Sequence, residues 1–136
     1  MRFILIALFS MVTFQASAAD QRVAIRCTHF GGLKEKVCPA SMVGLTSDTQ
    51  RFHGRTVAVS GYVKVIEGKP YLFTGKEFAD NFSMADSILL TGQVALLKGK
   101  NSSWMTLIGI LRPLSDLDYT DDIFRPIAKL DVQVIR

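Results

Sequence analysis

The sequence predicts an all-β domain, built as a small five-stranded barrel or a strongly curved antiparallel sheet with one or two short helices. Three observations lead to this prediction. Apolar and polar residues alternate along several segments, as they do in half-buried strands. Two of the longest segments carry an internal glycine, Gly61 or Gly109, where a strand can bend. Turn-forming residues separate five strand-like segments within a length that suits one domain.

The clearest strand covers residues 55–65, where β-branched side chains recur at every second position. The residues expected on its apolar face are Val57, Val59, Gly61, Val63 and Val65. Gly61 lies in the middle of this face, where a glycine weakens a flat strand. We therefore expect a bulge or a sharp bend there, which lets one strand serve two sides of a barrel.

A hairpin and a short helix follow this strand. Residues 67–70 (EGKP) form a predicted turn, and residues 71–74 (YLFT) return as the second strand. Residues 76–82 are predicted to be helical, because Phe78 and Phe82 are four positions apart and share a helix face.

Three further segments complete the five strands. Residues 87–91 and 104–111 are the predicted third and fourth strands, and residues 127–135 are the last. The apolar residues expected on one face of the last strand are Ala128, Leu130, Val132 and Val134. Residues 93–97 fit either a helical turn or a strand, and the acidic segment 114–122 is expected to be a loop.

The stretch GRTVAVSGYV at residues 54–63, followed by YLFT, resembles the small secreted bacterial domains of oligonucleotide/oligosaccharide-binding (OB) type, most of which have no assigned function. The resemblance covers residues 51–136, which we take as one β domain. It rests on a glycine–basic start, alternating valines and a mid-strand glycine. It implies an OB-like fold and specifies no function. The family places its helix between the third and fourth strands, whereas the predicted helix here lies between the second and third.

Residues 1–18 have the features of a secretory signal peptide. A basic start at Arg2 precedes an apolar run at residues 3–14, and small residues then allow cleavage after Ala18 or Ala19. This predicts a periplasmic or secreted protein. The apolar run is shorter than the ~20 residues that span a bilayer, so we expect no stable membrane insertion after cleavage.

Cys27 and Cys38 are the two cysteines of the chain, and a secreted protein with two cysteines has one possible intramolecular pairing. We expect this disulfide to pin an N-terminal segment, residues 19–50, onto the β domain. Within that segment we expect a short strand at residues 23–25, followed by a loop. Residues 41–50 fit either a strand end or a helical turn.

The sequence contains no pattern typical of catalysis or metal binding. Neither histidine has a visible catalytic partner, and two cysteines with two scattered histidines do not match zinc-ligand spacing. The acidic segment departs from a calcium loop, with Asp121 at the glycine position and Ile127 at the bidentate glutamate position. We therefore expect a non-enzymatic protein with no cofactor and no metal.

Two groups of residues are candidate ligand-binding sites. The first group precedes the clearest strand, could form an anion site at the barrel mouth, and consists of Arg51, His53 and Arg55. The second group could stack on bases or sugars, as aromatic residues do in OB-type domains, and consists of Tyr62, Tyr71 and Trp104. Tyr62 falls on the face opposite the valines, which could expose it. The alternative for both groups is a structural role, as solvated charges and as aromatic rings packed against connecting segments.

These features favour a binding module that acts through contact with another envelope or extracellular protein, as an inhibitor, immunity factor or envelope accessory factor. Such a module should expose an apolar or aromatic patch rimmed by charge. The alternative is an OB-type domain that binds an oligosaccharide or a nucleic acid. A formal net charge of +4, from 16 basic and 12 acidic residues, makes nucleic acid the weaker of these two ligands.

Overall fold

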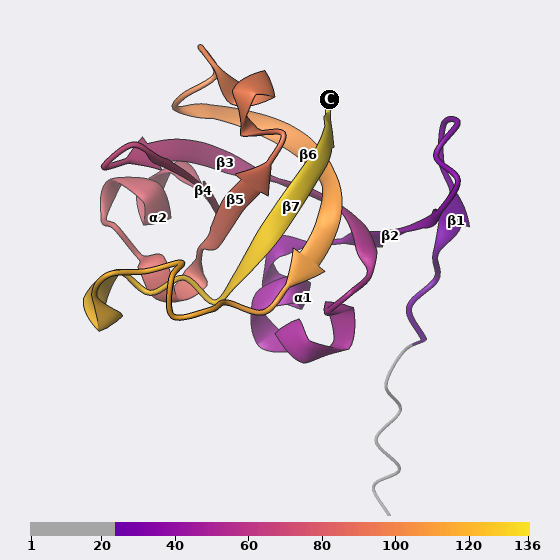
Figure 1. The fold of residues 1–136 in the computed structure, drawn as a ribbon, viewed down its shortest axis with the longest axis horizontal. Coiled ribbons are helices and arrows are strands. Elements are labelled where there is room, and N and C mark those ends of the chain that lie inside the picture. Colours follow the sequence, from indigo (N-terminus) through magenta and orange to yellow (C-terminus); the bar gives the residue numbers. More distant parts are fainter. Residues whose placement is uncertain (1–23) are drawn as a thin grey trace, which may run out of the picture.

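The computed structural model describes residues 24–136, in which five strands close into a barrel (Figure 1). These strands are β3 (Thr56–Ile66), β4 (Lys69–Phe73), β5 (Ile88–Gly92), β6 (Ser103–Arg112) and β7 (Ala128–Ile135). The prediction of a mostly β fold with a small barrel and two short helices is confirmed. The predicted signal peptide at residues 1–18, with its two cleavage positions, lies outside the described residues.

The barrel strands follow the order β3-β4-β5-β7-β6, and β6 pairs back with β3 to close the barrel. β5 and β7 are parallel, and the other neighbouring barrel strands are antiparallel. This arrangement is consistent with an OB-like fold. Helix α2 (Lys76–Asp80) lies between the second and third barrel strands, as the sequence predicts. The short 3-10 helix η3 (Val94–Leu97) connects the third and fourth.

The barrel interior is one hydrophobic cluster, filled from the inward faces of the strands. Val57, Val59 and Val63 of β3 are almost completely buried, as the alternation in this strand predicts, whereas Val65 is 39% exposed. The other strands contribute Leu72, Ile88, Leu90, Met105, Leu107, Leu111, Ala128, Leu130 and Val132. β3 pairs with β6 over residues 56–63 and with β4 over residues 62–66, so it serves two sides of the barrel.

Gly109 lies where the backbones of β6 and β7 come close together. The register between these strands shifts at this point, with Ile108 opposite Val134 and Gly109 opposite Val132. A Cβ atom on Gly109 would lie 2.4 Å from the carbonyl oxygen of Asp131. The bend expected at this glycine is therefore a β-bulge that brings two backbones into contact.

The bulge changes which residues of β7 face the barrel interior. An extra residue, Gln133, interrupts the alternation after Val132, because the partners of Ile108 and Gly109 are two positions apart. Ile135 lies opposite the buried Leu107 and packs against the core, whereas Val134 lies on the other face. The prediction that Val134 shares the face of Val132 is wrong, because one inserted residue reverses every side chain beyond it.

The chain before the barrel contributes to the same core. Strand β2 (Lys36–Ala40) lies parallel to β3, and helix α1 (Met42–Ser47) with the 3-10 helix η1 (Thr49–Phe52) leads into the barrel. The buried residues of this segment in the core are Cys38, Met42, Leu45 and Phe52. The disulfide joins Cys27 to Cys38, as predicted.

The strands of this N-terminal segment lie elsewhere than predicted. The short strand β1 (Thr28–His29) pairs antiparallel with β2, and Ile25 of the strand predicted at residues 23–25 lies outside both. β2 was not predicted because it contains Pro39, which lacks a backbone N–H and usually interrupts strands. Proline is tolerated here because β1 pairs only with Lys36 and Val37, so Pro39 lies on an uncovered edge.

A second, smaller hydrophobic cluster lies on the outer face of β3, β4 and β5. Helix α2 and the 3-10 helix η2 (Met84–Asp86) cover this face. The cluster consists of Tyr62, Tyr71, Phe73, Ala79, Met84 and Leu89. In OB-type barrels the face of the second and third strands is a usual ligand site. Here the connector between these strands occupies it.

Asp118 anchors the long connection between β6 and β7. Its carboxylate accepts hydrogen bonds from the Ser115 backbone N–H at 2.6 Å, the Ser115 hydroxyl at 2.8 Å and Lys129 Nζ at 2.8 Å. Burial alone raises the pKa of this carboxyl, but the hydrogen bonds from Lys129 and Ser115 outweigh burial and hold the pKa below its usual value.

We expect Asp118→Asn to lower the free energy of unfolding at neutral pH by about 1 kcal/mol, because it removes charged hydrogen bonds. A lowered folded-state pKa stabilises the protein above the unfolded-state value, and this contribution disappears as the pH falls through the folded-state value. The free energy of unfolding of both proteins is measured by denaturant at neutral pH and at the lowest pH that keeps the chain folded. We expect the difference between variant and wild type to be smaller at the lower pH. The exposed neighbour Asp116, changed to asparagine, is the matched control. An equal loss at both pH values would contradict this account.

Candidate functional site

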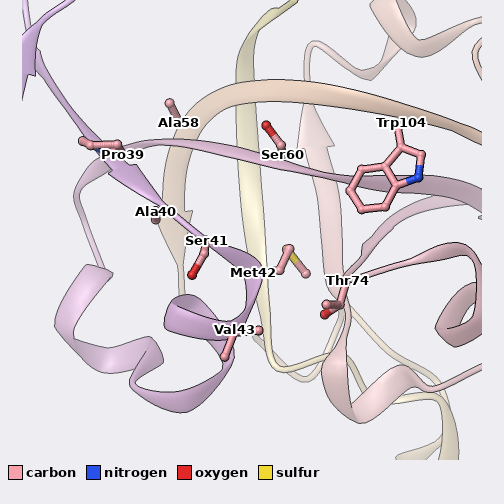
Figure 2. A pocket seen from close by; sticks show the side chains of 9 residues that line it. All are labelled: Pro39, Ala40, Ser41, Met42, Val43, Ala58, Ser60, Thr74 and Trp104. Carbon is pink, nitrogen blue, oxygen red and sulfur yellow. The ribbon is translucent and has the colours of Figure 1, made fainter.

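A shallow groove of about 580 Å³ lies where β2, helix α1 and the outer face of β3 and β6 meet (Figure 2). Figure 2 shows Trp104 on one side and Pro39 with Ala40 on the other, while Ala58 and Ser60 lie between them. The full lining consists of Pro39, Ala40, Ser41, Met42, Val43, Ala58, Ser60, Thr74 and Trp104. All of these described residues are uncharged, so the groove presents an apolar surface with a few hydroxyl groups.

Trp104 is the prominent side chain of this groove. It lies on β6 directly opposite Tyr62 of β3, with its side chain 60% exposed. Tyr62 is buried beneath it, and the two rings meet edge to face with centroids 6.4 Å apart. The buried tyrosine therefore supports an indole ring that is mostly exposed to solvent.

The floor of the groove is flat because small residues occupy the outer face of β3 beside Trp104. Ala58 and Ser60 alternate with the buried valines of this strand. Ser60 lies opposite Thr106 of β6, and their hydroxyl oxygens are 2.7 Å apart and hydrogen-bonded. Because these two hydroxyls bond to each other, the floor of the groove presents few free polar groups to a ligand.

The opposite wall is fixed by β2 and the start of α1. Parallel pairing places Pro39 beside Ala58 and Ala40 beside Val59. Ser41 then caps α1, accepting a hydrogen bond from the Gly44 backbone N–H at 3.0 Å. The cap sends Met42 into the barrel core and leaves Val43 65% exposed at the rim of the groove.

The structure places the three aromatic candidates in different environments. Tyr62 and Tyr71 are 6% and 7% exposed, within the cluster beneath α2. Of the two alternatives for Tyr62, exposure or packing against a connecting segment, the structure has the second, because the α2 connector covers the strand face opposite the valines. Burial, followed by the negative charge of Glu67, raises the pKa of Tyr71. Among these three residues, Trp104 is the one whose ring a ligand can reach.

The side chains of His53 and Arg55, two of the three residues of the predicted anion site, have different surroundings. His53 lines a polar cleft with Asp48 and Arg125, and its Nε2 atom is buried without a hydrogen-bond partner among the described residues. Arg55 is exposed and extends toward the disulfide, with its Nη1 atom 3.9 Å from Cys27 Sγ. An anion-binding role for these residues stays a prediction.

A second apolar hollow of about 450 Å³ lies at the far end of β3. Phe82 and Phe124 line it together with Val65, and all three side chains are partly exposed. Lys64 Nζ lies 4.9 Å from the centroid of the Phe82 ring and 3.3 Å from an Asp80 carboxylate oxygen. This hollow is an apolar patch rimmed by charge, as expected for a protein-binding surface, although the sequence did not indicate its position.

Within residues 24–136, no three His, Cys, Asp or Glu side chains gather in a way that could hold a metal ion. No helix in this part of the chain is long and apolar enough to cross a membrane.

Most of the groove was not predicted from the sequence. Trp104 is a candidate aromatic on a strand, but the wall opposite it comes from β2 and the start of α1, whose proximity depends on the parallel pairing of β2 with β3. One pattern could have indicated the floor. Small residues alternate with valines at Ala58 and Ser60, and small side chains on the outer face of a strand leave room above them.

Comparisons of this chain with protein-family models, with curated proteins and with solved structures find no match.

Proposed function

We propose that this protein is a periplasmic or secreted binding module that acts through contact with another protein and carries out no catalytic step. The groove beside Trp104 is its contact surface. The observation that carries the proposal is the Trp104 side chain, 60% exposed on the wall of a groove whose described residues are all uncharged. A largely exposed tryptophan beside an apolar hollow is typical of the anchors that dominate protein interfaces.

The chemistry of the groove favours a polypeptide partner with apolar side chains. A nucleic acid or an acidic glycan needs cations, and the described lining residues provide none. A neutral sugar ring could stack on Trp104, but the groove lacks amide and carboxylate side chains, and the Ser60 and Thr106 hydroxyls bond to each other. An apolar side chain needs only the surface that Trp104, Pro39 and Val43 supply.

The covered outer face of β4 and β5 also favours a polypeptide partner over an oligonucleotide. OB-type domains commonly bind oligonucleotides on this face and its flanking loops. Here Ala79 of α2 and Met84 of η2 bury the aromatic residues that could stack on bases. An oligonucleotide would have to displace a packed hydrophobic cluster to reach Tyr71.

Site-specific photo-crosslinking tests this proposal. A photoreactive amino acid replaces Val43 at the rim of the groove, and in a matched variant it replaces Leu96, which is 48% exposed in η3 and does not line the groove. The exported, oxidised protein is irradiated in an envelope extract at high salt. We expect a discrete protein adduct from position 43 that is absent from position 96. Equal labelling from both positions, or adducts with glycan and no protein, would contradict the proposal.

A further inference from the structure

The disulfide-closed hairpin formed by β1 and β2 projects to one side of the barrel (Figure 1). The Cys27–Cys38 bridge joins the two strands at its base. At the tip, the Leu33 backbone N–H donates to the Phe30 carbonyl oxygen at 3.1 Å, across Gly31 and Gly32. The hairpin is therefore held in one shape at both ends.

Basic side chains surround this hairpin. Lys34 and Lys36 belong to it, Arg26 directly precedes Cys27 at its base, and all three are exposed. Two more cations reach it from the barrel. Arg55 lies against the disulfide, with Nη1 3.9 Å from Cys27 Sγ, and the Arg136 guanidinium lies 4.4 Å from the centroid of the Phe30 ring.

These cations have no acidic partner in the described part of the chain. No Asp or Glu oxygen of residues 24–136 lies within 4.0 Å of any of their charged nitrogen atoms. The one acidic residue of the hairpin, Glu35, accepts a hydrogen bond from the buried Thr56 hydroxyl at 2.8 Å. One of its carboxylate oxygens is thereby held at the start of β3, while the residue itself stays exposed between Lys34 and Lys36.

The tip between these cations is apolar. Phe30 is 37% exposed, Leu33 is half-buried, and the two glycines between them carry no side chain. An apolar tip ringed by Lys and Arg is the pattern of segments that rest in the interface of a membrane, with apolar groups among the acyl chains and cations at the lipid phosphates. A soluble polyanion would use the cations and leave Phe30 in water.

We propose that the hairpin docks this protein onto the surface of an anionic lipid bilayer. Lys34, Lys36 and Arg26 contact lipid phosphates, and Phe30 enters the interface with Arg136 beside it. The disulfide strengthens the contact because a hairpin already held in its bound shape loses little conformational entropy on docking. This attachment is peripheral and uses residues distinct from those that line the Trp104 groove.

Vesicle co-sedimentation tests the electrostatic part of this proposal. The exported, oxidised protein is mixed with vesicles of phosphatidylglycerol and phosphatidylcholine, or of phosphatidylcholine alone. We expect binding to the anionic vesicles that weakens as salt is added. The double variant Lys34→Ser, Lys36→Ser should bind about tenfold to thirtyfold more weakly. The matched control Lys98→Ser, Lys100→Ser removes two exposed lysines of the same spacing elsewhere, and it should bind as the wild type does.

A second pair of variants distinguishes a bilayer from a soluble polyanion. Phe30→Ser should weaken vesicle binding several-fold and leave binding to heparin unchanged, whereas Phe78→Ser, at a similarly exposed phenylalanine of α2, should change neither. Absence of binding to anionic vesicles would overturn the proposal. So would equal losses in the two lysine pairs, or a Phe30 variant that binds vesicles as well as the wild type.

Discussion

Replacing Gly109 by alanine is expected to lower the free energy of unfolding by about 3 kcal/mol. The new methyl group would lie 2.4 Å from the Asp131 carbonyl oxygen and 3.0 Å from the Val132 Cα atom. These are backbone atoms of β7, held by its pairing with β5 and β6, so they cannot move aside as a side chain can. Equilibrium denaturation in urea measures the loss.

Gly75→Ala is the matched control for this prediction. Gly75 is also buried, but a Cβ atom there would meet first the Glu77 Oε2 atom, at the end of a flexible side chain that can rotate away. We expect this variant to remain within about 1 kcal/mol of the wild type. If Gly109→Ala were no more destabilising than Gly75→Ala, the close approach of β6 and β7 would be wrong.

Replacing Trp104 by alanine is expected to weaken binding of the protein partner by about 2 kcal/mol or more, which is roughly thirtyfold. The substitution removes the largest apolar surface of the groove. The free protein should lose little stability, because Trp104 is mostly exposed and lies outside the buried core. Affinity for the partner identified by crosslinking, measured by titration with each purified variant, gives the comparison.

Phe82→Ala serves as the control for the tryptophan variant. Phe82 is 50% exposed, but it lines the second apolar hollow at the far end of β3. We expect its removal to leave partner affinity unchanged. A large loss in the Phe82 variant, with full binding by the Trp104 variant, would move the contact surface to that hollow.

The barrel strands were predictable because apolar and polar residues alternate along them as the side chains alternate between the buried and the outer face. Alternation from Val57 to Val63 gives the correct inward face, and Gly61 and Gly109 both lie where neighbouring backbones come close, although the pairing register shifts only at Gly109. The predicted disulfide followed from the presence of only two cysteines.

The errors arise where a distant contact changes the meaning of a local pattern. Alternation correctly placed Tyr62 on the outer face, but it could not show that a connector more than ten residues later in the chain folds over it. Alternation also placed Val134 on the inner face, and the bulge opposite Gly109 reversed it. The edge strand β2 was not predicted because proline usually interrupts strands. Pro39 is tolerated because β1 does not pair with β2 at this residue, which the sequence does not show.

The groove was less predictable than the fold for the same reason. Trp104 could be identified as an aromatic on a strand, whereas its position opposite Tyr62 depends on the register of β3 and β6. The wall opposite Trp104 depends on β2 lying parallel to β3, and parallel pairing between segments separated by a helix leaves no periodic pattern in the sequence.

The most direct test of the central claim uses Trp104, the single tryptophan of the chain, as its own reporter. Incorporation of 5-fluorotryptophan gives a single ¹⁹F resonance, and its change in chemical shift between H₂O and D₂O measures solvent contact at that ring. We predict a large solvent-dependent shift in the free protein, because the indole is 60% exposed. The solvent dependence should disappear when the crosslinked partner, purified without the label, is added at saturation. An unchanged, solvent-sensitive resonance in the fully formed complex would contradict the claim that the Trp104 groove is the contact surface.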